Sequence, residues 1–327
     1  MSVQYVKLGD VCAKDSSNIA QKDLKDCFGK YPVYGAGGYI QNVDFYHQED
    51  EYIAIVKDGA GVGRAMILPA KSSVIGTMQY IIPDKNKVDM YYLYYAIINM
   101  ALGKYFSGAT IPHIYFKDYQ KEIFKLPDLE TQKKIADNLK NIDLIIAKKN
   151  KQIGLFNELV KSRFIEMFGD AQVNPRNFTI MPWEKVFFTT TGKLDSNAMV
   201  EDGQYPFFTC AKEIFKIDTY AFDCEALLLA GNNAAGIYDV KYYKGKFNAY
   251  QRTYVLRLTN SRWSYQLFKK QLEDKLLYLQ TKSKGTNTRY LTMGILKELQ
   301  FLVPPIILQN EFAYFVEQTD KSKFGIQ

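Results

Sequence analysis

The chain has 327 residues, of which 47% are hydrophobic and 24% charged, a composition typical of a globular protein of about two domains. Lys and Arg exceed Asp and Glu by 42 to 35, and the formal net charge of +7 suits a polyanionic partner such as nucleic acid. No apolar run reaches the ~18 residues of a membrane span, and the N-terminus has no signal-peptide pattern. Four scattered cysteines do not form a disulfide scaffold, so we expect a reduced, cytoplasmic protein.

The first part of the chain alternates short apolar runs with turns. Runs rich in Tyr, Val and Ile predict strands at residues 52–56, 65–68 and 80–82, and residues 91–102 predict a helix. Residues 57–64, Lys-Asp-Gly-Ala-Gly-Val-Gly-Arg, superficially resemble a nucleotide-binding loop. The glycine spacing is wrong and a strand follows instead of a helix, so we expect no nucleotide site there.

A long helix is predicted at residues 129–168, and at 1.5 Å per residue it would extend roughly 60 Å. From residue 135 the positions of one face step by four and three residues, and eight of these ten are apolar. The positions are Ile135, Leu139, Ile142, Ile146, Lys149, Ile153, Phe156, Val160, Arg163 and Met167. Such a seam needs a partner along its length. We favour the equivalent helix of the second half or a helix from another subunit over packing on its own domain.

The second half of the chain repeats the first, at an offset of 174 residues that later becomes 177. The matched segments are 31–34 with 205–208, 51–56 with 225–230, 108–110 with 285–287, 126–128 with 303–305, and Gln132 with Gln309. Within the second half we expect a strand at residues 254–258 and a helix at 264–279. The repeat of the long helix should carry its seam at Phe312, Val316, Thr319 and Lys323, with about half the length of the first helix.

Motifs of catalysis are missing from the sequence. There is no G-x-x-x-x-G-K-[ST] phosphate loop and no Asn/Asp-Pro-Pro-Tyr/Phe motif of an amino-methyltransferase. Pro127, Asp128 and Glu130 suggest a nuclease motif, but Gln132 stands where its lysine would be. With only two histidines, His47 and His113, and no close ligand pairs, we expect neither a catalytic centre nor a metal site.

Hydrogen-bonding side chains gather at the turns of both repeats, where they suit contacts with base edges and phosphates. The candidate DNA-binding residues are Lys57, Asp58, Arg64, Thr110, His113, Lys212, Asn232, Asn233, Gln251, Arg252, Asn287, Arg289 and Tyr290. Each of them could instead cap a strand or a hairpin. The repeats differ most at matched sites, as in Ile-Pro-His at 111–113 against Thr-Arg-Tyr at 288–290. This difference predicts two different short sequences read by one chain.

Four motifs, in this order, resemble the specificity subunit of Type I restriction–modification systems. They are residues 31–39 (Tyr-Pro-Val-Tyr-Gly-Ala-Gly-Gly-Tyr), 58–64, 107–114 (Ser-Gly-Ala-Thr-Ile-Pro-His-Ile) and 126–136, which opens the long helix. Each motif is loose by itself, but their order and duplication cover essentially the whole chain.

The resemblance implies a mixed α/β fold with two pseudo-symmetric target-recognition domains, each followed by a helix, and the helices pair as an antiparallel coiled-coil spacer. The implied domains are 1–128, 129–170, 171–304 and 305–327, the last being the shortened second helix. The family implies a non-catalytic subunit that recognises a bipartite DNA target in defence against foreign DNA. S-adenosylmethionine, ATP and Mg²⁺ then belong to partner subunits and not to this chain.

The implied partners are double-stranded DNA, two methyltransferase subunits, and through these the restriction subunits. Subunit docking is expected along Ile135, Leu139, Ile142, Ile146, Ile153, Phe156, Val160, Met167, Phe312 and Val316. Because the second helix is short, we expect the seam around residues 135–142 to be covered by a methyltransferase subunit, a second copy of the chain or a separate fragment. Alternative interpretations are the specificity chain of a Type II system with a fused nuclease–methyltransferase partner, a stand-alone enzyme, and a coiled-coil scaffold without DNA binding.

Overall fold

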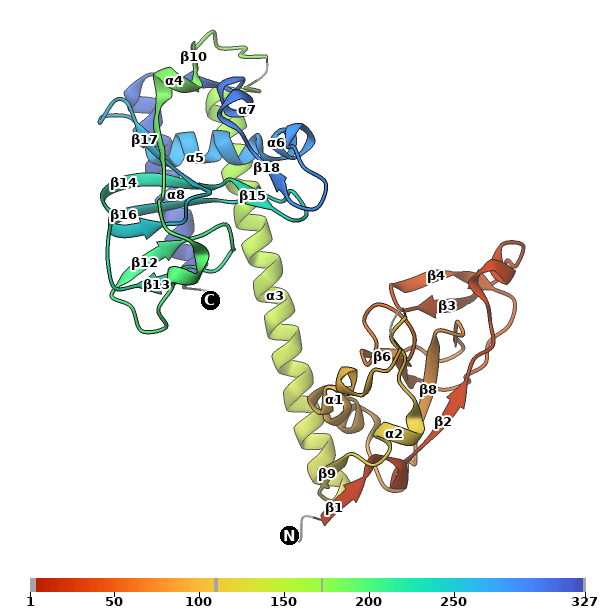
Figure 1. Cartoon of the computed structure of the whole chain (residues 1–327). Helices are drawn as coiled ribbons and strands as arrows, with labels where there is room; N and C mark the ends of the chain where they lie inside the picture. The colour runs from red at the N-terminus through yellow and green to blue at the C-terminus, as the bar shows by residue number, and fades with distance from the viewer. Residues whose placement is uncertain (1–3, 109–110, 172, 326–327) are drawn as a thin grey trace. The chain divides into compact units, whose positions relative to one another are not determined.

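The computed structural model describes residues 4–108, 111–171 and 173–325 (Figure 1). The chain divides into two compact units, Met1–Ala147 and Lys148–Gln327, and the boundary falls inside the long helix α3 (Leu129–Phe168). α3 has the bounds that the heptad pattern predicts. Within the described residues, no helix is long and apolar enough to cross a membrane.

Unit 1 is built around a four-stranded antiparallel sheet, which is accompanied by two smaller sheets. In sheet order the strands are β2 (Cys12–Ser16), β8 (Met78–Pro83), β5 (Tyr52–Val56) and β6 (Ala65–Leu68); then β4 (Gly38–Val43), β3 (Tyr31–Gly35) and β7 (Ser73–Val74); then β1 (Gln4–Lys7) with β9 (Ile123–Leu126). Its helices are η1 (Leu8–Asp10), η2 (Gln21–Leu24), α1 (Met90–Met100), η3 (Leu102–Tyr105) and α2 (Phe116–Tyr119).

The centre of unit 1 follows from one continuous apolar run. All five residues of β5 are buried, which requires a strand covered on both faces. α1 covers one of these faces, and its Leu93 and Ile97 pack in the same cluster as Ile53 and Ile55. The side chain of Asp89 caps the start of α1 by accepting a hydrogen bond from the backbone amide three residues later, and α1 ends before the left-handed Ala101. The observed helix is thus slightly shorter than the predicted helix 91–102.

Unit 2 contains a six-stranded sheet and two pairs of strands. In sheet order the strands are β11 (Phe187–Thr191), β17 (Thr253–Leu258), β14 (Phe222–Ala230), β16 (Val240–Ala249), β12 (Tyr205–Phe208) and β13 (Phe215–Ile217); then β15 (Asn232–Asn233) with β18 (Arg289–Tyr290); then β10 (Thr179–Pro182) with β19 (Gln300–Val303). Its helices are α4 (Trp183–Val186), η4 (Ser196–Ala198), α5 (Tyr265–Asp274), α6 (Leu276–Lys282), α7 (Met293–Lys297) and α8 (Ile306–Phe324). α5 lies against β14 and β16 (Figure 1).

The single helix predicted at 264–279 is wrong, because the structure has two helices there. The backbone N–H of Lys275 bonds to the carbonyl of Leu272, three residues back, at φ −95° and ψ −3°, and this tighter bond ends α5. α6 then buries Leu279 in the same core cluster as Phe268 and Leu272.

The predicted duplication is confirmed strand by strand. The sheet order β2-β8-β5-β6 returns as β11-β17-β14-β16, and the parallel pair β3–β7 returns as β12–β16. The register is kept as well: Gln4 pairs with Leu126 across β1 and β9, and Thr179 pairs with Val303 across β10 and β19. The two units are therefore copies of one mixed α/β fold.

The end of α3 packs against the start of α8 within unit 2. The ring centroid of Phe312 lies 5.7 Å from that of Phe164 and 5.6 Å from that of Phe168. One turn earlier in α3 and one turn later in α8, Val160 and Val316 belong to the same buried cluster. Residue numbers fall along one helix as they rise along the other, so this segment of the pair is antiparallel.

Candidate nucleic-acid interface

In unit 1, two segments far apart in sequence meet at the end of the central sheet. Residues 57–64 form the turn of the β5–β6 hairpin, where the amide of Gly63 donates to the carbonyl of Val56 at 2.8 Å. The second segment is joined to this turn by the amide of Ile114, which donates to the carbonyl of Lys57 at 2.9 Å. The glycine-rich stretch is thus a hairpin turn that supports a second loop.

Three candidate side chains of unit 1 form one hydrogen-bonded group. Asp58 accepts from the ammonium of Lys57 through Oδ2 and faces Nδ1 of His113 through Oδ1, both at 2.7 Å. Burial alone would raise the pKa of Asp58, but the hydrogen bonds from His113 and Lys57 outweigh it and hold this pKa below its ordinary value. The carboxylate is therefore ionised at neutral pH.

In unit 2, the corresponding segments pair as the short strands β15 and β18. Asn232 stands opposite Tyr290 and Asn233 opposite Arg289. The amide of Leu291 donates to the carbonyl of Gly231 at 2.8 Å, the equivalent of the bond that joins the two segments of unit 1. Four of the predicted residues are thus brought together by backbone pairing.

The two loop pairs share one backbone frame at the offsets of the repeat. Asp58 pairs with His113 across a β-bridge, just as Asn232 pairs with Tyr290. The second loop closes through reciprocal backbone hydrogen bonds in both units. Their lengths are 2.8 Å and 2.8 Å between Ser107 and His113, and 3.1 Å and 2.8 Å between Lys284 and Tyr290. One frame therefore presents different side chains in the two units.

A glycine is required at the same point of each loop. Gly108 has φ +99° and Gly285 has φ +100°, a left-handed conformation that disfavours any side chain. A Cβ at these positions would lie 2.5 Å from the carbonyl oxygen of Ile111 and 2.2 Å from that of Thr288. The matched glycines are explained by close approach of the backbone.

Several predicted residues also make internal contacts. The Arg64 guanidinium donates to the carbonyl of Ala36, in the turn between β3 and β4, and Arg289 donates to the carbonyl of Gln280 at 3.2 Å. The side-chain oxygen of Asn233 accepts from two backbone amides of its own turn. These contacts hold the loops in place, which agrees with the alternative that such residues cap strands or hairpins.

The remaining predicted residues are more dispersed. Gln251 and Arg252 form the turn between β16 and β17, and the carbonyl of Arg252 accepts from the amide of Gly231. Lys212 and Asn287 are exposed in loops. Thr110 lies outside the described residues.

A cavity of about 450 Å³ lies beside Asn232 and was not predicted from the sequence. Its lining residues are Ser196, Asn197, Met199, Thr209, Cys210, Ala211, Phe215, Asn232 and Tyr250. The run of polar residues at 195–197 was a signal for it. Within residues 4–108, 111–171 and 173–325, no group of three or more His, Cys, Asp or Glu could hold a metal ion.

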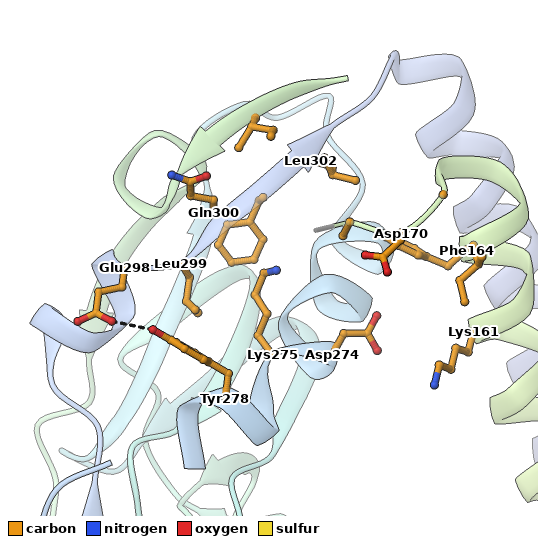
Figure 2. A pocket seen from close by; sticks show the side chains of 15 residues that line it. Lys161, Phe164, Asp170, Asp274, Lys275, Tyr278, Glu298, Leu299, Gln300 and Leu302 are labelled. Atoms are coloured by element: carbon orange, nitrogen blue, oxygen red, sulfur yellow. Dashed lines mark hydrogen bonds between the residues drawn. The ribbon is translucent and has the colours of Figure 1, made fainter. Parts of the chain in front are cut away.

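A second cavity of unit 2, of about 640 Å³, lies against the end of α3 (Figure 2). Phe164 contributes from α3, while Lys275 contributes from the break between α5 and α6. Burial lowers the pKa of the Lys275 ammonium, which lies 5.6 Å from the ring centroid of Phe301. Figure 2 also shows the hydrogen bond of 2.8 Å from Tyr278 to Glu298.

Unit 1 has a cavity of about 700 Å³ at the equivalent place. Tyr5, Asn99 and Phe124 line it where Ile180, Asp274 and Phe301 line the cavity of unit 2. The end of α3 forms part of the wall in unit 2, and Leu139, from the first half of α3, forms part of the wall in unit 1.

The apolar seam of α3 is buried only near its end. Val160 and Met167 are buried, while Ile142 and Ile146 are exposed. Other exposed apolar residues of α3 are Leu144, Ile145, Leu155, Leu159 and Ile165. The contrast between repeats is clearest at one matched pair: Ile135 of α3 is 37% exposed, and its equivalent Phe312 of α8 is 0% exposed.

Parts of the sequence are similar to known proteins. The chain is 42% identical over 117 residues to the Type I restriction enzyme EcoDI specificity subunit of Escherichia coli. The aligned segment covers 35% of this chain and 25% of that protein. The chain is 28% identical over 142 residues to the MjaVIII specificity subunit of Methanocaldococcus jannaschii, or 42% of this chain and 33% of that protein. The aligned part thus spans a quarter to a third of these curated relatives. Their names do not favour the Type II alternative.

The fold also matches a solved structure, that of the Type I restriction–modification system S subunit from M. genitalium. The TM-score is 0.69 at 15% identity, over 99% of this chain and 91% of that chain. The family model of the Type I restriction modification DNA specificity domain matches residues 2–155 and again residues 177–327. Because these two matches fall on the two structural repeats and together cover most of the sequence, the chain belongs to the family of Type I restriction–modification DNA specificity domains.

Proposed function

We propose that this chain is the DNA-recognition subunit of a Type I restriction–modification complex, and that each unit reads one half of a split target. The observation that carries the proposal is the shared frame of the two loop pairs. It presents Asp58 and His113 in one unit, and Asn232 and Tyr290 in the other. Base edges are read by such donors and acceptors, while lysines and arginines bind phosphates. The chain itself would carry no catalytic centre, and it would act in the cytoplasm, where its DNA is.

The net charge of +7 supports a polyanionic partner. Phosphate contacts fix the register of a protein on DNA but do not select a sequence. Different side chains on the same frame would therefore give two different half-sites at a fixed separation. Arg289 would read a base edge in addition to its contact with Gln280, so Arg289→Ala should lower the free energy of base discrimination in the second half-site by about 1–3 kcal/mol.

We further propose that methyltransferase subunits dock along the exposed seam of α3. Ile142 and Ile146 are exposed although they lie on the same apolar stripe as Val160 and Met167, which are buried. Burying one such side chain contributes roughly 1.5–3 kcal/mol, and an exposed row of them favours association. The restriction subunits would then attach through the methyltransferase subunits.

The DNA proposal is tested by sequencing the methylome of a host that expresses the complete system. A methylated motif in two halves, separated by a constant number of unspecified bases, is the expected result. A continuous motif, or sequence-independent binding of the assembled complex in gel-shift assays, would contradict it.

Docking is tested by size-exclusion chromatography with light scattering, on the chain alone and with the methyltransferase subunit. We expect a complex that Ile142→Asp weakens and that the exposed but off-seam variant Asn141→Asp leaves intact. A monomer that ignores the methyltransferase would refute docking. A stable dimer of the chain alone would assign the seam to a second copy.

A further inference from the structure

The side chain of His113 is held in one orientation by its neighbour. Both oxygens of Asp58 are occupied, one by Lys57 and the other by Nδ1 of His113, at 2.7 Å each. An ionised carboxylate only accepts hydrogen bonds, so Nδ1 carries a proton and donates it. The other ring nitrogen, Nε2, has no hydrogen-bond partner among the described residues, and the side chain is 38% exposed.

Space beside this ring is kept free by the glycine of the loop. A Cβ at Gly108 would lie 3.2 Å from Cδ2 of His113, the ring carbon bonded to Nε2. The same glycine is required by the backbone, as described above. Gly108 therefore leaves room beside the Nε2 edge of His113, while the Nδ1 edge is used inside the protein.

We propose that His113 is a specificity-determining residue of the first half-site, with Asp58 as its positioning residue, and that His113 reads a base edge through Nε2. This inference rests on the proposed DNA-binding function. When the imidazole is neutral, Nε2 accepts and pairs with the amino group of adenine or cytosine in the major groove. The base preferred at one position of the first half-site thus depends on His113 and on the orientation that Asp58 gives its ring.

Other charged groups around this loop are already engaged. Arg64, on the same hairpin turn, donates to the carbonyl of Ala36. Lys104, on η3 behind the turn, is paired with Glu122. Among the described residues, Asp58 is the charged partner of His113, at its Nδ1 side, and Lys57 pairs with the other oxygen of Asp58.

Unit 2 supplies an internal control, because its frame is the same but its side chains are not. Asn232 stands in place of Asp58, and Tyr290 in place of His113. No imidazole is present there, so substitutions of His113 should leave the base preference of the second half-site unchanged. A general loss of folding or of the partner subunits would alter both half-sites alike.

The experiment uses the complex of the full chain with its methyltransferase subunits and the target found by methylome sequencing. Binding of the wild type and of His113→Ala to duplexes with single changes in each half-site is measured by fluorescence anisotropy at constant pH and ionic strength. We expect His113→Ala to lower the discrimination at one base pair of the first half-site by about tenfold, the size of one base-edge contact. The second half-site should show no such change.

Two variants separate reading from folding. His113→Gln has an amide that both donates and accepts, so it should bind DNA with an altered base preference at that position of the first half-site. Asp58→Asn lets the ring take either tautomer, so it should lower discrimination in the first half-site only. If His113→Ala keeps the wild-type discrimination in the first half-site, or if Asp58→Asn lowers discrimination in both half-sites alike, the inference is wrong. If no split motif exists at all, the proposed function fails together with it.

Discussion

The two repeats bury one matched position to different extents, and a pair of substitutions measures the difference. Phe312→Ala removes a fully buried ring that packs edge-on against Phe164 and Phe168. Truncating a buried phenylalanine costs about 3–5 kcal/mol. Ile135→Ala is the equivalent change in unit 1, but Ile135 is 37% exposed. With about a third of the side chain already in water, we expect a cost of about 1–2 kcal/mol.

The assay must report on each unit separately, because a chain with two units need not unfold in one step. Hydrogen exchange measured by mass spectrometry at increasing urea gives free energies of opening for peptides of each unit. Phe312→Ala should lower these values in α8 and the end of α3, and Ile135→Ala should act weakly at the start of α3. Phe312→Leu is the matched control, with a smaller cavity and a smaller loss.

Adding the methyltransferase subunit should change the result for Ile135→Ala but not that for Phe312→Ala. If the seam is a docking surface, the complex buries Ile135, and Ile135→Ala then weakens the complex in addition to its effect on the free chain. Equal losses of stability for Phe312→Ala and Ile135→Ala in the free chain would refute the structural reasoning. A cost below about 1 kcal/mol for Phe312→Ala would do the same.

Three further outcomes are expected. Gly285→Ala should destabilise unit 2 by about 1–3 kcal/mol, since φ is +100° and a Cβ would meet a backbone oxygen. Gly154→Ala, in the open middle of α3, should stabilise the helix by about 0.5–1 kcal/mol. Urea unfolding of the two variants measures both changes. Gln309→Leu should cost about 1–3 kcal/mol in the same assay, because the buried amide N–H of Ser264 loses its acceptor, 3.1 Å away. Burial raises the pKa of Cys12 to about 12, so iodoacetamide at pH 8 should leave it unlabelled in the native protein and label it in urea, as read by mass spectrometry.

Elements with a strong local signal were predictable from sequence. The strand at Tyr52–Val56 is a continuous apolar run between charged residues, and the structure gives it the same bounds. The start of α3 follows Pro127, and the Asp128 carboxylate accepts from the amide of Thr131 at 2.9 Å, as an N-cap does. Such signals lie within a few residues of one another, so no knowledge of the tertiary fold is needed to interpret them.

The break between α5 and α6 was not predictable in this way. Residues 264–279 contain no proline or glycine, and nothing in their pattern marks Lys275. The break allows α6 to place Leu279 in the main core of unit 2. It is therefore a consequence of tertiary packing, which overrides a local preference for helix.

For the candidate site, the residue types were predictable and their pairings were not. Asp58 and His113 are 55 residues apart, and only the meeting of two loops reveals that one positions the other. Conversely, Asn233 resembles a base-reading residue in the sequence, but its side-chain oxygen is used by its own turn. A residue at a turn has the same signature whether it reads a ligand or holds the loop.

The way the loops are built explains how two copies of one frame can present different side chains. The bonds that join and close the loop pairs run between backbone atoms, so they do not depend on which side chains are attached. The exception is the glycine at 108 and 285, where a Cβ would collide with the backbone. Substitutions at positions 58, 113, 232 and 290 can therefore change what each unit presents without dismantling its frame. On this reasoning, exchanging only these four side chains between the units should move base preferences from one half-site to the other, while the separation of the half-sites stays constant.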